Sequence, residues 1–122
     1  MEKELFDFIA ERTEILSTSP ASTQVTKDAA LAWKNAVTAD AGDDVFDAAT
    51  KELLDILEGR PSTIDDVIAF AQGPAASMFG EEAAAQMLVK QQERKAQGAK
   101  YCDCPSCTAA TELLAKFGRI EL

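Results

Sequence analysis

Apolar residues recur every three to four positions along almost the whole chain, which is the period of an amphipathic α-helix. No segment shows a convincing alternation of apolar and polar residues, the pattern of a half-buried strand. Glycines, prolines and runs of small polar residues interrupt the helical pattern, and such residues commonly separate helices. The pattern therefore predicts an all-α fold.

The interruptions divide the chain into five or six predicted helices. Ser22 or Thr23 should begin the second helix and Ser62 the fourth, because a hydroxyl at the cap position accepts a hydrogen bond from the first turn. Connections of roughly three to six residues favour antiparallel neighbours, so we expect one compact helical bundle in a single domain, residues 1–122. The predicted helices cover approximately residues 2–16, 22–37, 43–58, 62–72, 81–97 and 104–117, with a short turn at 75–79.

An apolar stripe on the second predicted helix contains Val25, Ala29 and Trp33, and we expect all three to face the core. Trp33 is the only tryptophan, and its place on this stripe favours a packing role over a ligand platform. With 47% apolar residues, a chain of this length can bury one substantial core.

The formal net charge of −9 is concentrated in one half of the chain. Residues 1–66 hold fifteen acidic and six basic side chains, whereas residues 67–122 hold six of each. Because phosphates attract lysine and arginine, this excess of acid argues against nucleic acid as a partner. The acidic half is expected to be a solvated surface or, alternatively, a surface that binds a basic protein partner.

No apolar run approaches the roughly 20 residues that a membrane-spanning helix needs. The first residues also lack the basic start and the apolar stretch of a signal peptide. We therefore expect a cytoplasmic protein that is not inserted in a membrane.

Residue types that commonly carry catalysis are scarce. The chain has no histidine, which removes the commonest general base and the commonest metal ligand. Two acidic pairs, Asp43-Asp44 and Asp65-Asp66, fall at predicted helix starts, where the helix dipole stabilises negative charge. A non-enzymatic protein is therefore favoured.

The three cysteines of the chain all fall within the segment 102–107, which reads CDCPSC. Pro105 suits the first position of a helix, because its φ is fixed and its missing N–H would be unpaired there. Cys104 is then the cap residue and Cys107 the third helical residue, so both sulfurs can converge over the helix N-terminus, where the dipole stabilises thiolate. Cys102 can fold back toward the same point from the incoming segment.

Four interpretations of this cluster are open, and the favoured one is a metal site, most simply for zinc, with Cys102, Cys104 and Cys107 as ligands. A reducing cytoplasm disfavours a structural disulfide. A thiol-disulfide oxidoreductase could use Cys104 to attack and Cys107 to resolve, but the βαβ pattern around such motifs is missing. An iron–sulfur cluster is less favoured, since the spacing matches neither ferredoxin pattern. The cysteines could also simply pack a turn.

A metal site here is one ligand short. Closed structural zinc sites have four protein ligands, whereas this chain supplies three thiols and no imidazole. Asp103, a distant carboxylate, a water molecule or a second subunit would have to complete the coordination sphere. A homodimer is therefore a possible assembly, since two copies could complete each other's sites.

The segment 98–107, which reads GAKYCDCPSC, resembles a group of small proteins from anaerobic bacteria. They share a Lys-Tyr-Cys-Asp-Cys-Pro-small-Cys signature near the C-terminus, followed by a terminal helix; segment 68–71 and a single tryptophan in the second helix are also similar. Such proteins are often labelled heat-shock proteins or molecular chaperones, so the resemblance implies a stress-linked role. Nothing in the chain resembles the ATP-binding domain of the large chaperones.

Overall fold

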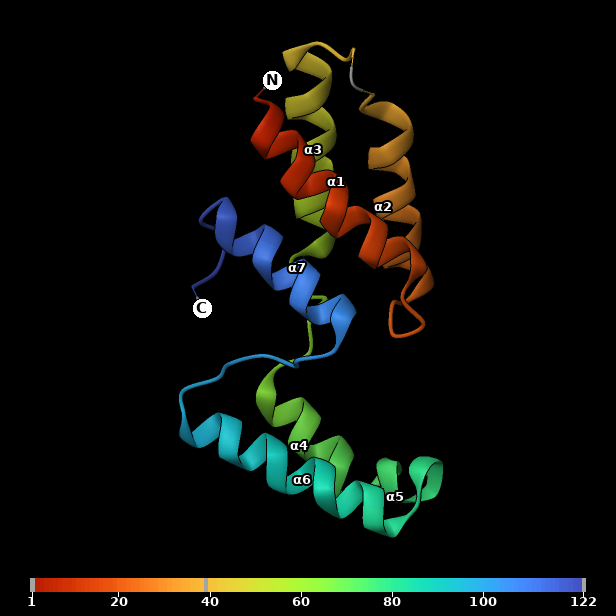
Figure 1. The fold of residues 1–122 in the computed structure, drawn as a ribbon, viewed down its shortest axis with the longest axis vertical. Coiled ribbons are helices and arrows are strands. Elements are labelled where there is room, and N and C mark those ends of the chain that lie inside the picture. Colours follow the sequence, from red (N-terminus) through yellow and green to blue (C-terminus); the bar gives the residue numbers. More distant parts are fainter. Residues whose placement is uncertain (1, 39, 122) are drawn as a thin grey trace. The chain divides into compact units, whose positions relative to one another are not determined.

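The computed structural model describes residues 2–38 and 40–121, and the regular secondary structure of these residues is entirely helical (Figure 1). The all-α prediction is thus confirmed, but the described residues form seven helices rather than five or six. The additional helix is α5, which replaces the predicted turn because Pro74 starts a new helix directly after Gly73. The helices are α1 (Lys3–Thr18), α2 (Gln24–Ala36), α3 (Asp43–Leu57), α4 (Ile64–Gln72), α5 (Pro74–Phe79), α6 (Glu81–Ala96) and α7 (Pro105–Lys116).

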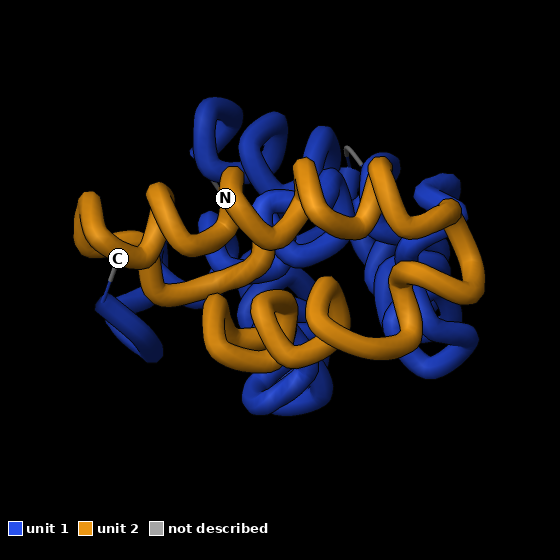
Figure 2. The backbone as a smooth tube through the Cα atoms, turned by 90° about the horizontal axis from the view of Figure 1, so that it is seen from below, with its two compact units in different colours: residues 1–61, 103–121 blue, residues 62–102, 122 orange. Residues whose placement is uncertain are grey.

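The chain divides into two compact units, coloured separately in Figure 2. The four-helix unit comprises residues 1–61 and 103–121 and contains α1, α2, α3 and α7. The three-helix unit comprises residues 62–102 and contains α4, α5 and α6. The expectation of a single domain stays a prediction, because compactness does not establish whether a unit folds by itself.

The four-helix unit is built around one apolar core to which all four of its helices contribute. Within it, α1 packs against α2 and α7, while α3 packs against α2 and α7. Trp33 is only 2% exposed, and its Nε1 donates a hydrogen bond to Thr50 Oγ1 at 3.0 Å, so its predicted packing role is confirmed. The buried core residues are Ile9, Leu16, Ala29, Ala30, Trp33, Val37, Phe46, Leu53, Leu54, Leu57, Ala109, Ala110, Leu113 and Leu114.

The predicted inner stripe of α2 is only partly right. Ala29 is buried as expected, but Val25 is 45% exposed. Thr26 and Ala30 are buried instead, because α2 contacts α1 as well as α3 and its buried face follows both neighbours. Neighbouring helices thus decide which residues of an amphipathic helix face inward.

The three-helix unit begins with a capping box at α4. Thr63, rather than the predicted Ser62, is the cap residue, and its hydroxyl accepts a hydrogen bond from the Asp66 amide at 3.1 Å. The Asp66 carboxylate accepts the Thr63 amide in return at 3.2 Å, so this acid has the helix-start role expected for it. The buried apolar residues of the unit are Ile64, Ala71, Ala75 and Ala84.

Candidate metal centre

Two of the three cysteines occupy the start of α7, as the sequence predicts. Pro105 is the first residue of the helix and Cys104 is its cap, in an extended conformation with φ −65° and ψ 156°. The Cys104 sulfur accepts a hydrogen bond from the Cys107 amide at 3.3 Å. A thiol thus takes the place of the usual hydroxyl or carboxylate cap, and its sulfur lies where the helix dipole favours negative charge.

The third cysteine is held by backbone pairing within the three-helix unit. The Cys102 amide donates to the Ser62 carbonyl at 2.8 Å, and the Ile64 amide donates to the Lys100 carbonyl at 2.9 Å. Thr63 and Tyr101 form the isolated antiparallel bridge between these two bonds. Ser62 therefore contributes a carbonyl that anchors Cys102.

The structure brings the three sulfur atoms to within 4.8 Å of one another. All three side chains are half-buried thiols. Tetrahedral zinc with Zn–S bonds of about 2.3 Å places its sulfurs about 3.8 Å apart, so side-chain movements of about 1 Å would close this group around an ion. Cys102, Cys104 and Cys107 therefore fit a soft metal ion in both donor type and spacing.

No carboxylate of residues 2–38 and 40–121 joins the three sulfurs as a fourth member of the group. Asp103, which the sequence suggested as a ligand, instead lines a surface hollow together with Arg12, Thr108 and Glu112. The site thus offers three protein ligands, which for zinc leaves one coordination position to an external donor.

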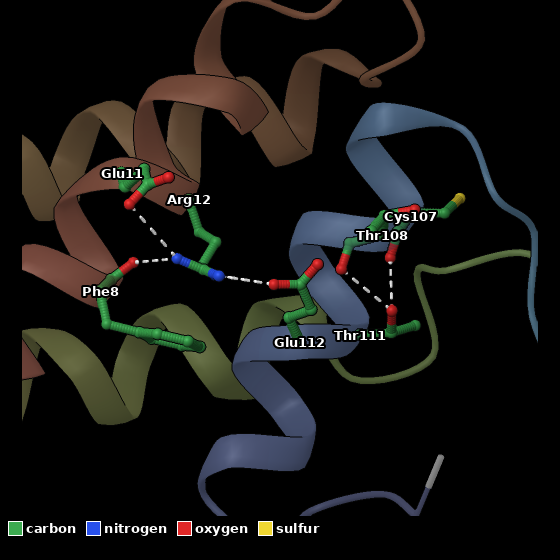
Figure 3. Close-up of polar contacts among 7 residues, drawn as sticks. All are labelled: Phe8, Glu11, Arg12, Cys107, Thr108, Thr111 and Glu112. Carbon is green, nitrogen blue, oxygen red and sulfur yellow. Dashed lines mark hydrogen bonds and ion pairs between the residues drawn. The ribbon is translucent and has the colours of Figure 1, made fainter.

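An ion pair joins α7 to α1, and hydrogen bonds within α7 support its first turns (Figure 3). The Arg12 guanidinium lies 3.7 Å from the ring centre of Phe8 and donates to the Glu112 carboxylate at 2.6 Å, which joins α1 to α7. The Thr111 hydroxyl donates to the Cys107 carbonyl at 2.9 Å. The backbone that carries Cys107 is therefore supported from within its own helix, and the cysteine sulfur points away from Arg12.

Just beyond α7, the Arg119 guanidinium donates to Asp55 of α3 at 2.6 Å. Hydrogen bonds from Lys51 and Arg119 hold the pKa of Asp55 below its ordinary value. This ion pair supports the C-terminal side of α7, as the Arg12–Glu112 pair supports its middle.

One contact at the cysteine segment has no counterpart in the sequence pattern. The Ser22 hydroxyl, in the loop between α1 and α2, donates to the Ser106 hydroxyl at 2.7 Å. The sequence offered Ser22 or Thr23 as the cap of α2, and Thr23 is the cap. No local signal could identify the Ser22 contact, since 84 residues separate its partners.

Comparison of the chain with known protein families, with curated proteins and with solved structures finds no match. Among the described residues, no helix combines the length and apolar character needed to cross a membrane. The geometry of the cysteine cluster therefore carries the functional argument.

Proposed function

We propose that this protein is a non-enzymatic metal-binding protein that holds one soft metal ion, zinc, through Cys102, Cys104 and Cys107. The observation that carries the proposal is the approach of all three sulfurs to within 4.8 Å of one another. Thiolates favour zinc and copper(I) over hard cations such as magnesium. An iron–sulfur cluster is the weaker candidate, because such clusters ordinarily take four cysteine ligands.

The fourth zinc ligand is proposed to be water or a donor from a second copy of the chain. The resemblance of segment 98–107 to proteins labelled as heat-shock proteins supports a stress-linked role, such as metal handling or redox sensing in the cytoplasm. Metal binding to the folded chain would also stabilise it, by about 2.7 kcal/mol when free zinc is 100-fold above its Kd.

The decisive experiment is elemental analysis combined with native mass spectrometry of protein purified without chelator. We expect one zinc ion per chain, and the mass gives the subunit number directly. Replacing any of Cys102, Cys104 or Cys107 with serine should remove the metal. Ser17→Ala is the control, because this hydroxyl donates to the Glu14 carbonyl of its own helix in a solvent-exposed hydrogen bond.

Metal-free wild-type protein that also fails to take up added zinc would overturn the proposal. A zinc ion that survives all three cysteine substitutions would overturn it equally, because the ion would then have other ligands. Two zinc ions per dimer would support a donor from the second copy at each open position, whereas a monomer with one zinc ion would support water.

The hydrogen bond from the Cys107 amide to the Cys104 sulfur supports a second candidate function, a thiol-disulfide oxidoreductase. The Cys104 thiolate would attack a substrate disulfide and displace one substrate thiolate, which leaves a mixed disulfide. The Cys107 thiolate would then attack Cys104 and release the second substrate thiolate. The substrate gains two electrons, and the protein retains a Cys104–Cys107 disulfide.

A Cys107→Ser variant separates this function from metal binding. An oxidoreductase lacking its resolving cysteine accumulates the mixed disulfide, which non-reducing electrophoresis with a model disulfide substrate detects. A metal-binding protein loses its zinc instead and accumulates no adduct beyond that formed by a Cys104→Ser control.

A further inference from the structure

The loop between α1 and α2 contacts the cysteine segment through a buried pair of hydroxyl groups. Ser22 donates to Ser106 with an oxygen–oxygen distance of 2.7 Å. Ser22 is only 8% exposed and Ser106 only 6%, so both hydroxyls are largely removed from water. A buried hydroxyl that loses its hydrogen-bond partner is destabilising, so this bond favours one arrangement of the two segments.

The loop that presents Ser22 is itself fixed by local hydrogen bonds. The Ser22 amide donates to the Ser19 carbonyl at 3.1 Å, and the Ala21 amide donates to the Ser19 hydroxyl at 3.2 Å. At the end of α1, the Ser19 amide donates a hydrogen bond to the Ile15 carbonyl at 2.9 Å, while Thr23 caps α2. Hydrogen bonds on both sides of Ser22 in the sequence thus fix the loop that presents it to α7.

Ser106 lies in the same helical turn as two of the sulfurs. It follows Pro105 and directly precedes Cys107 in the first turn of α7. The Thr108 amide donates to the Cys104 carbonyl at 2.9 Å, and the Cys107 amide donates to the Cys104 sulfur. Displacement of Ser106 would therefore displace the cap and the third residue of the helix together.

We propose that Ser22 is a positioning residue of the metal centre. Its hydroxyl fixes the first turn of α7 through Ser106, so that Cys104 and Cys107 are already oriented toward a common ion before the ion binds. The inference rests on the proposed metal-binding function and adds a contributor from outside the cysteine segment. Partners that orient metal ligands typically account for 10- to 100-fold in affinity.

The test is titration of the full-length, metal-free protein with cobalt(II), which reports thiolate ligation through its absorption spectrum, followed by competition with zinc. Ser22→Ala should keep one cobalt per chain but weaken binding by about 10-fold or more. Ser106→Ala should weaken it similarly. The double variant should lose little beyond either single change, because both remove the same hydrogen bond.

Ser17→Ala serves as the control, and all titrations are run well below the melting temperature of each variant. A merely structural role for Ser22 would lower the melting temperature yet leave the cobalt affinity and spectrum at the control values, and that result overturns the inference. If wild-type protein takes up no cobalt or zinc, the proposed function itself fails. The two failures are therefore distinguishable.

Discussion

At the scale of single residues, Cys104 combines two roles that normally belong to different side chains. It caps α7 by accepting the Cys107 amide, and it contributes one of three clustered sulfurs. The roles are compatible, because a thiolate accepts an amide hydrogen bond better than a thiol does. Metal ligation at Cys104 should therefore strengthen the helix start.

Two substitutions at Cys104 separate these roles. Cys104→Ser should abolish metal binding while preserving the cap, since serine is a favoured cap residue. Cys104→Ala should abolish both and leave the metal-free protein about 1 kcal/mol less stable than the serine variant. Urea unfolding in the presence of chelator measures the difference. Equal stability of the two variants would show that the side chain at position 104 does not cap α7.

At the scale of helices, a buried polar contact fixes how α2 packs against α3. Trp33 on α2 donates its indole N–H to the Thr50 hydroxyl on α3, and both side chains are buried. The Trp33 ring also contacts Phe6 of α1 and Phe46 of α3, with ring centres 5.8 and 6.3 Å away. One side chain thus joins three helices, with the hydrogen bond specifying its orientation.

Thr50→Val should destabilise the protein by about 1–3 kcal/mol, because it leaves the buried indole N–H without its acceptor at nearly unchanged volume. Thr50→Ser is the matched control, since it keeps the hydroxyl and removes only a methyl group. Urea unfolding followed by the fluorescence of Trp33 measures both. A valine variant as stable as wild type would contradict the importance of this hydrogen bond.

At the scale of the whole molecule, the two units differ in the size of their cores. The four-helix unit buries large side chains from all its helices, whereas three of the four buried apolar residues in the three-helix unit are alanines. The three-helix unit also spans only residues 62–102. Segments of about 40 residues rarely fold alone without a disulfide, a metal or a partner.

A peptide comprising residues 62–102 should therefore be largely unfolded in water at neutral pH. Circular dichroism of the peptide should show little helix and no cooperative thermal transition. The full-length protein should be strongly helical and should unfold cooperatively. A helical peptide with a cooperative melt would establish the three-helix unit as an independent domain and contradict the single-domain prediction.

The helices, the start of α7 and the burial of Trp33 could be predicted from the sequence because each depends on residues close together in the chain. The apolar period of three to four residues specifies helices, and proline at a first helical position specifies the start of α7. Cys104 as the cap and Trp33 in the core follow from the same local patterns. These features depend on residues within one or two helical turns, so each can be predicted from its own segment of the sequence.

Tertiary structure alone decided the features that join distant segments. It exposed Val25, assigned the α4 cap to Thr63 and bonded Ser22 to Ser106. It also paired the Cys102 amide with Ser62, 40 positions earlier in the chain. Each outcome depends on which helix faces or backbone groups meet after packing. Spacing along the chain does not specify these tertiary contacts. A serine before a helix, for example, can cap that helix or hydrogen-bond to a distant segment, and the local sequence is the same in both cases.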